Sequence, residues 1–175
     1  MGYVYWRDPS ELKRVVKALP LYGNIMIDFI SRDVPDPFEG VDSKMDYSCV
    51  DDHCELRSIG KDVRIHVPKR SLLLLFKMKA AWDRNHRLVH NTSYDPIWER
   101  SKLTKDRADI LALLDPQAGG GEIEVSFLGD MIEKYGFLAR TLEEIRSDVG
   151  AMDMYGRMGA KDVNDLIVRL LLLIR

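Results

Sequence analysis

An apolar run that begins at Leu72 constrains the fold more than any other stretch of this sequence. Residues 72–82 read LLLLFKMKAAW, with apolar residues at Leu72, Leu75 and Phe76 that recur at helical spacing. The basic residues Arg84, His86 and Arg87 follow. We therefore predict a helix over residues 69–88 that buries its apolar side in the core.

Two cations of this helix are expected on one face. Lys77 and Arg84 are seven residues apart and nearly eclipse each other around the axis. Lys79 lies about 200° away from Lys77. The pair Lys77 and Arg84 either binds an anion jointly or is a solvated basic flank of the helix, and the sequence leaves both interpretations open.

A second charged segment follows a polar loop over residues 91–101. Thr104 is a suitable N-cap for a helix that runs to Leu114. Asp106 would then lie in the first turn, where the helix dipole favours a carboxylate, and could be structural only. Lys105 and Asp109 belong to the same charged helix start.

Before residue 31 the pattern indicates a strand over residues 3–6, a helix within residues 11–19 and a strand over residues 25–30 that is covered on both faces. Asp28 alone interrupts the second strand. A buried carboxylate costs several kcal/mol unless it is paired, hydrogen-bonded or bound to a metal. Asp28 therefore lies at a sheet edge, bonds an arginine or a backbone amide, or faces a functional site.

For the middle of the chain we predict a surface loop followed by a hairpin. Residues 31–48 contain no clear element, and residues 53–59 and 63–67 flank a Gly-Lys-Asp turn. Val63, Ile65 and Val67 alternate with polar residues, which indicates one buried and one solvated face. His66 would then be a surface residue rather than a catalytic one.

The C-terminal part is expected to be helical, over residues 126–135, 141–148 and 161–174, with Thr141 and Glu144 as a capping box. The glycines at 119–121 lack a following Lys-Ser/Thr and indicate a flexible linker rather than a phosphate-binding loop. The last helix is apolar enough to cap the core or to form a dimer contact.

The two cysteines exclude a disulfide scaffold. Cys49 and Cys54 flank His53 and could offer ligands to zinc, but no second ligand pair lies at suitable spacing, so buried or edge thiols are the alternative.

A chain of 175 residues with 46% apolar content fits one globular domain. Its net charge of -2 gives no general attraction to nucleic acid or membranes. We find no leader and no apolar span of about 18 residues, and we expect a cytoplasmic protein without a membrane partner.

Taken in order, these residues resemble the polymerase-β-type nucleotidyltransferase superfamily, and most closely its AbiEii-like group. The resemblance covers residues 3–114. It implies that Asp28, in the strand IMIDFI, is the third catalytic carboxylate and a Mg²⁺ ligand. It also implies nucleotide or phosphate contacts by residues of the two later helices, namely Lys77, Arg84, Lys105, Asp106 and Asp109.

The sequence departs from that family at its start. Members begin with a Gly-Ser motif and an Asp-x-Asp pair that hold two Mg²⁺ ions and the NTP, and this sequence contains neither. We therefore expect a core truncated at its N-terminus, through a truncated gene, a late start or a real loss. Asp28 would be a metal ligand if those motifs lie upstream and a remnant if they do not, because one carboxylate cannot hold two metal ions.

The expected fold is α+β, with a small mixed sheet of a nucleotidyltransferase-like core followed by a helical bundle. Residues 1–67 would form the sheet-containing part and residues 68–175 the helical part of one domain. The expected function is NMP transfer from NTP to an RNA or protein hydroxyl if the first motif exists, with an incomplete active site otherwise. The alternative is a non-catalytic nucleotide-binding or protein-interaction module, such as a toxin–antitoxin partner. Expected partners are NTP, an RNA or protein acceptor, and a second copy or another protein on the C-terminal helices.

Overall fold

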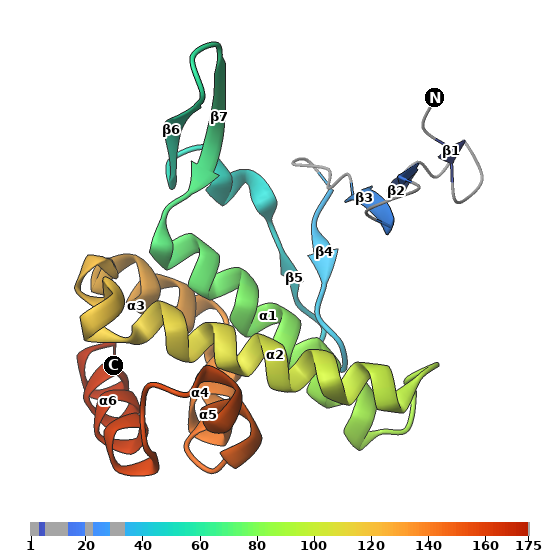
Figure 1. Ribbon diagram of the computed structural model, residues 1–175. Helices are drawn as coiled ribbons and strands as arrows, with labels where there is room; N and C mark the ends of the chain where they lie inside the picture. The colour runs from blue at the N-terminus through green and yellow to red at the C-terminus, as the bar shows by residue number, and fades with distance from the viewer. Residues whose placement is uncertain (1–3, 6–13, 20–22, 29–33, 175) are drawn as a thin grey trace.

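Helices form the body of the molecule. The computed structural model describes residues 4–5, 14–19, 23–28 and 34–174. Figure 1 shows two long helices lying side by side, with the shorter helices packed around one end of the pair. The described helices are α1 (Arg70–Val89), α2 (Pro96–Leu114), α3 (Val125–Lys134), α4 (Ala139–Ile145), α5 (Val149–Tyr155) and α6 (Ala160–Leu173).

Short antiparallel sheets precede the helices. A three-stranded sheet has the order β1-β2-β3, and the pairs β4–β5 and β6–β7 form two further sheets. The strands are β1 (Val4–Tyr5), β2 (Arg14–Leu19), β3 (Gly23–Asp28), β4 (Asp36–Pro37), β5 (Lys44–Met45), β6 (Cys54–Ile59) and β7 (Val63–Pro68). The chain is thus an α+β protein, but every described strand pair is antiparallel and the predicted mixed sheet is wrong for this part of the chain.

The helix predicted within residues 11–19 is also wrong. Residues 14–19 form β2, whose backbone pairs with β3 along its whole length, from Arg14 opposite Asp28 to Leu19 opposite Gly23. The β-branched residues Val15 and Val16 favour a strand over a helix, and the segment between the prolines at 9 and 20 is short for a helix. The expected strand over 25–30 is present as β3 as far as Asp28.

The leucine run forms one side of α1, as predicted. Leu72, Leu74 and Leu75 are fully buried, whereas Leu73 points outward. They pack with Ile110 and Leu111 of α2 in a core that α3, α4 and α6 extend. Other large apolar side chains that are fully buried include Met78, Leu128, Leu138, Leu142, Ile145 and Ile167.

Residues 34–48, the described part of the segment predicted as a surface loop, contribute to this core. Phe38 and Met45 are buried, and the Phe38 ring lies 4.9 Å from that of Phe137. The indole nitrogen of Trp82 donates to the carbonyl of Glu39 at 3.0 Å. Isolated apolar residues in a polar, proline-rich stretch carry no periodicity, so their burial was not evident from the sequence.

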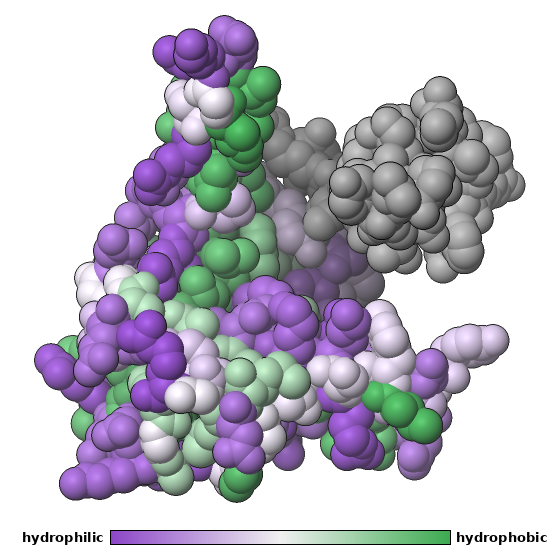
Figure 2. Space-filling model, in the orientation of Figure 1, coloured by the Kyte–Doolittle hydropathy of each residue, from purple (hydrophilic) through white to green (hydrophobic). Residues whose placement is uncertain are grey.

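The hairpin is present as predicted, but its apolar face is exposed. Ile59, Val63 and Ile65 are all exposed, and so is His66, as expected. Figure 1 shows β6 and β7 projecting away from the helices, and Figure 2 shows apolar surface along this projection. The predicted burial of one face is therefore wrong for the described structure, because no helix covers it there.

The start of α2 and the cap of α4 differ from the prediction. α2 begins at Pro96 rather than near Thr104, because the side chain of Asp95 caps it by accepting from the amide of Trp98 at 3.0 Å. α4 has no side-chain cap, so the capping box predicted from Thr141 is wrong, and Asp148 instead caps the unpredicted α5. The helices over 126–135 and 161–174 are confirmed as α3 and α6.

Short 3₁₀ turns connect several elements, at η2 (Tyr47–Val50), η3 (Pro116–Ala118), η4 (Gly120–Glu122) and η5 (Gly136–Leu138). The glycine run predicted as a flexible linker is therefore part of two ordered turns. Among the described residues, none of the helices combines the length and the apolar character that crossing a membrane requires.

We expect Leu75→Ala to lower the free energy of unfolding by about 2–5 kcal/mol, because a fully buried side chain is removed and a cavity remains. Leu73→Ala is the matched control on the same helix. Leu73 is 37% exposed, so its loss should cost at most about 1 kcal/mol. Urea unfolding followed by circular dichroism measures both variants, and equal losses would contradict the one-sided burial of α1.

Candidate functional site

Five of the six residues singled out from the sequence meet between α1 and α2. Lys77 donates to Asp106 Oδ1 at 2.9 Å, and Arg84 Nε donates to Asp106 Oδ2 at 2.8 Å. Lys77 also pairs with Asp109 at 2.7 Å, and Lys105 bonds Asp109 at 2.6 Å. We call Lys77, Arg84, Lys105, Asp106 and Asp109 the α1–α2 cluster.

Helical spacing produces this arrangement. Lys77 and Arg84 are two turns apart on one face of α1, as predicted, and Asp106 of α2 lies between them. The anion that they share is thus a carboxylate of this chain. Because α2 starts at Pro96, Asp106 is in the middle of the helix and not in its first turn. Its stabilisation comes from two cations rather than from the helix dipole.

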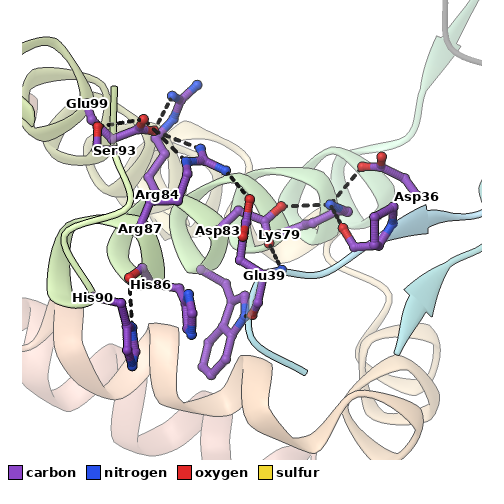
Figure 3. A network of polar contacts seen from close by, with 12 residues as sticks. Asp36, Glu39, Lys79, Asp83, Arg84, His86, Arg87, His90, Ser93 and Glu99 are labelled. Carbon is purple, nitrogen blue, oxygen red and sulfur yellow. Dashed lines mark hydrogen bonds and ion pairs between the residues drawn. The ribbon is translucent and has the colours of Figure 1, made fainter. Parts of the chain in front are cut away.

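A second carboxylate extends the cluster along α2. Glu99, which is buried, accepts from Arg84 at 3.0 Å and from Arg87 at 2.8 Å. Arg87 also pairs with Glu39 at 3.0 Å. Figure 3 shows Arg84 and Arg87 converging on Glu99. The sequence reading missed Glu99 and Arg87, although the dipeptide Asp95-Pro96 signals a helix start that places Glu99 inside α2.

A neighbouring network fastens the segment before η2 to α1. Lys79 is buried and donates to Asp83 at 2.7 Å and to the carbonyl of Pro37 at 3.0 Å, and it pairs with Asp36 at 2.8 Å. Figure 3 shows Lys79 lying between Asp83 and Asp36. Lys79 is therefore a structural cation on the side of α1 away from the cluster, consistent with its spacing from Lys77.

The ion pairs shift the pKa values of their members. Burial by itself would lower the pKa of Lys77, but hydrogen bonds to Asp109 and Asp106 outweigh it and raise the pKa. Burial would raise the pKa of Asp109, but hydrogen bonds from Lys105 and Lys77 lower it. The pKa of Glu99 is also lowered, because Arg87 and Arg84 outweigh the effect of burial. All three groups stay charged near neutral pH.

Asp28 is not part of the described cluster. Its backbone ends β3, opposite Arg14, and the position of its side chain lies outside the described structure. Figure 1 places β1–β3 to one side of α1 and α2. The contacts described for Lys77 and Lys105 come from Asp106 and Asp109. That Asp28 shares a site with these cations, as the resemblance implies, therefore stays a prediction.

The cluster does not by itself suit Mg²⁺. Asp106 and Asp109 are both neutralised by cations, and a metal ion would have to displace them. Among the described residues, no group of three or more histidine, cysteine or acidic side chains is arranged to hold a metal ion. A Mg²⁺ site would need further oxygen ligands.

The cysteine segment provides separate contacts. His53 stacks on Phe127, with ring centroids 4.0 Å apart, and lies 3.5 Å from a carboxylate oxygen of Glu124. Cys49 and Cys54 are free, half-buried thiols. Burial raises the pKa of both, so the reactive thiolate form is disfavoured at neutral pH.

Comparison of the chain with protein-family models, with curated proteins and with solved structures found no match. The function proposed below therefore rests on the residue pattern and on the geometry of the cluster.

We expect Asp109→Asn to lower the free energy of unfolding at pH 7 by about 1 kcal/mol, because two charge-assisted hydrogen bonds are weakened at a partly exposed site. Since the folded pKa of Asp109 is below its ordinary 3.8, its contribution is complete above that value and is lost as the pH falls through the lower folded pKa. The variant should thus lose less stability than the wild type on acidification. Urea unfolding at pH 7 and at progressively lower pH measures this difference.

Asp153→Asn is the matched control, because Asp153 is exposed on α5. Its stability should follow that of the wild type at every pH. An unchanged pH dependence in Asp109→Asn would show that the cluster does not hold Asp109 in its charged form.

Proposed function

We propose that this chain provides part of a nucleotidyltransferase-like site, which transfers NMP from NTP to a hydroxyl group of RNA or protein. The supporting observation is the pairing of Lys77 and Arg84 across Asp106. These residues match the positions that the resemblance assigns to nucleotide contacts, and they are adjacent in the structure.

The cations can still contact phosphate while they are ion-paired. Lys77 has three N–H donors, and two are directed at Asp106 and Asp109. Among the described contacts, Arg84 uses Nε and one terminal nitrogen, which leaves the other terminal nitrogen for a ligand. Their side chains are 26% and 21% exposed, respectively. The carboxylates would thus orient both cations while one donor of each faces an incoming triphosphate.

NMP transfer needs more than these residues. Two Mg²⁺ ions, when bound, neutralise the charge that develops in phosphoryl transfer, and the cluster alone does not fit them. The sequence has no Gly-Ser dipeptide and no Asp-x-Asp. We therefore assign catalysis only to a protein or complex that also supplies those motifs, with Asp28 as its third carboxylate. This chain by itself is assigned nucleotide binding without transfer.

A protein-interaction module is the second candidate. It is favoured by the apolar side chains that β6 and β7 expose, including Ile59, Val63 and Ile65. It is also favoured by the internal neutralisation of Lys77 and Arg84, which needs no ligand. A toxin–antitoxin partner would be one such module, and it would co-purify as a stable complex.

Thermal unfolding with Mg²⁺ and each of the four NTPs distinguishes the two candidates. Nucleotide binding should raise Tm as NTP is added, because a ligand that binds only the folded state stabilises it by mass action. Lys77→Met should abolish the NTP-dependent shift, whatever its own Tm. Lys161→Met, on an exposed position of α6, should keep the full shift.

If no NTP raises Tm at millimolar concentration, the proposal of nucleotide binding is overturned. The protein-interaction module is then the function that the structure favours. An equal shift in the Lys77→Met variant would place the nucleotide elsewhere. An in-frame Gly-Ser and Asp-x-Asp directly upstream in the DNA would support the catalytic assignment.

A further inference from the structure

A half-exposed tryptophan lies beside the cluster. Trp98, in the first turn of α2, is 50% exposed. The guanidinium carbon of Arg84 is 5.2 Å from the centroid of its ring, and Nζ of Lys102 is 5.6 Å from it. Both cations are thus within cation–π distance of the ring, and half of the side chain stays open to solvent.

Further polar and cationic residues continue from Trp98 along one face of α2. Trp98, Lys102 and Lys105 are spaced i, i+4 and i+7, so they lie on one stripe of the helix. We call these three residues the α2 strip. Lys105 is 53% exposed, and it contacts Asp109 at the end of the strip. The strip therefore leads from an aromatic ring to the α1–α2 cluster.

Most of the carboxylates around the strip are paired with cations of this chain. Glu99 is buried and shared by Arg84 and Arg87, and Asp109 is shared by Lys77 and Lys105. Asp95 is occupied as the cap of α2. Among the described contacts, Lys102 makes no ion pair. Local attraction for an anion is possible here although the whole chain has a net charge of -2.

A second aromatic side chain precedes the strip. Tyr94 is fully exposed in the loop between α1 and α2. Figure 1 shows the joined ends of α1 and α2 projecting beyond the shorter helices, so this end of the pair is accessible. An exposed surface suits an extended chain better than a small molecule, which binds in a concave pocket.

We infer that the α2 strip binds single-stranded nucleic acid, with a base stacked on Trp98 and backbone phosphates at Lys102 and Lys105. Aromatic rings and lysines in one row are the combination by which proteins hold single strands without reading their sequence. A duplex fits less well, because its bases are already stacked on each other. Such binding goes beyond the proposed NMP transfer, since it requires neither NTP nor a metal ion.

Fluorescence anisotropy with a short labelled single-stranded RNA of mixed sequence tests this inference on the full chain. Trp98→Ala should weaken binding roughly 5- to 100-fold, in line with the loss of one base–aromatic stack. Lys102→Ala should reduce the slope of log K against log salt concentration by about 0.7, because one phosphate contact is lost. Trp98→Phe should recover part of the affinity lost in Trp98→Ala.

Ile97→Ala is the matched control, since Ile97 adjoins Trp98 and is 86% exposed but lies off the strip. It should bind RNA like the wild type. The inference is overturned if the chain binds no single strand at low salt, or if it prefers the duplex of the same sequence. It is equally overturned if Trp98→Ala binds normally, or if anionic vesicles bind and RNA does not. Circular dichroism melts confirm that each variant is folded.

Discussion

The shared carboxylate of Asp106 is the interaction on which the arrangement of α1 and α2 depends. It is only 6% exposed, and each of its oxygens accepts from a different cation of α1. A buried carboxylate is tolerated only when it is paired and hydrogen-bonded, so Lys77 and Arg84 are needed wherever Asp106 is buried. The geometry of two cations on one anion also fixes the register of the two helices, because a shift of one residue would leave a buried charge without its partners.

The helix pair has two different faces. Leu72, Leu75 and Ile110 supply the burial that drives packing, and the polar network across the other side specifies the alignment. The apolar contacts would permit many registers of similar energy, whereas the ion pairs permit few. The cations that would contact a nucleotide are thus placed by the same bonds that hold the fold together, and function and stability share residues here.

Periodicity in the sequence was enough to predict α1 and the common face of Lys77 and Arg84. The sequence left open whether Lys77 and Arg84 bind an anion or are solvated. The structure gives them Asp106 as a shared partner, and a pairing between two helices cannot be read from either helix alone. The start of α2 differs from the prediction because Asp95 caps the helix and Pro96 begins it, so Thr104 lies inside it. The prediction of a helix within residues 11–19 was wrong because a short apolar pattern fits both the helical and the strand periodicity. Pairing with β3 stabilises the strand.

A double-mutant cycle between Arg84 and Asp106 tests the central claim most directly. Unfolding free energies are measured for Arg84→Ala, Asp106→Ala and the double variant. We expect a coupling energy of about 1–3 kcal/mol, because each single variant leaves the other charge buried without its partner. A coupling energy near zero would contradict the account, since Asp106 would then be held by other contacts and the two helices would not depend on this pair.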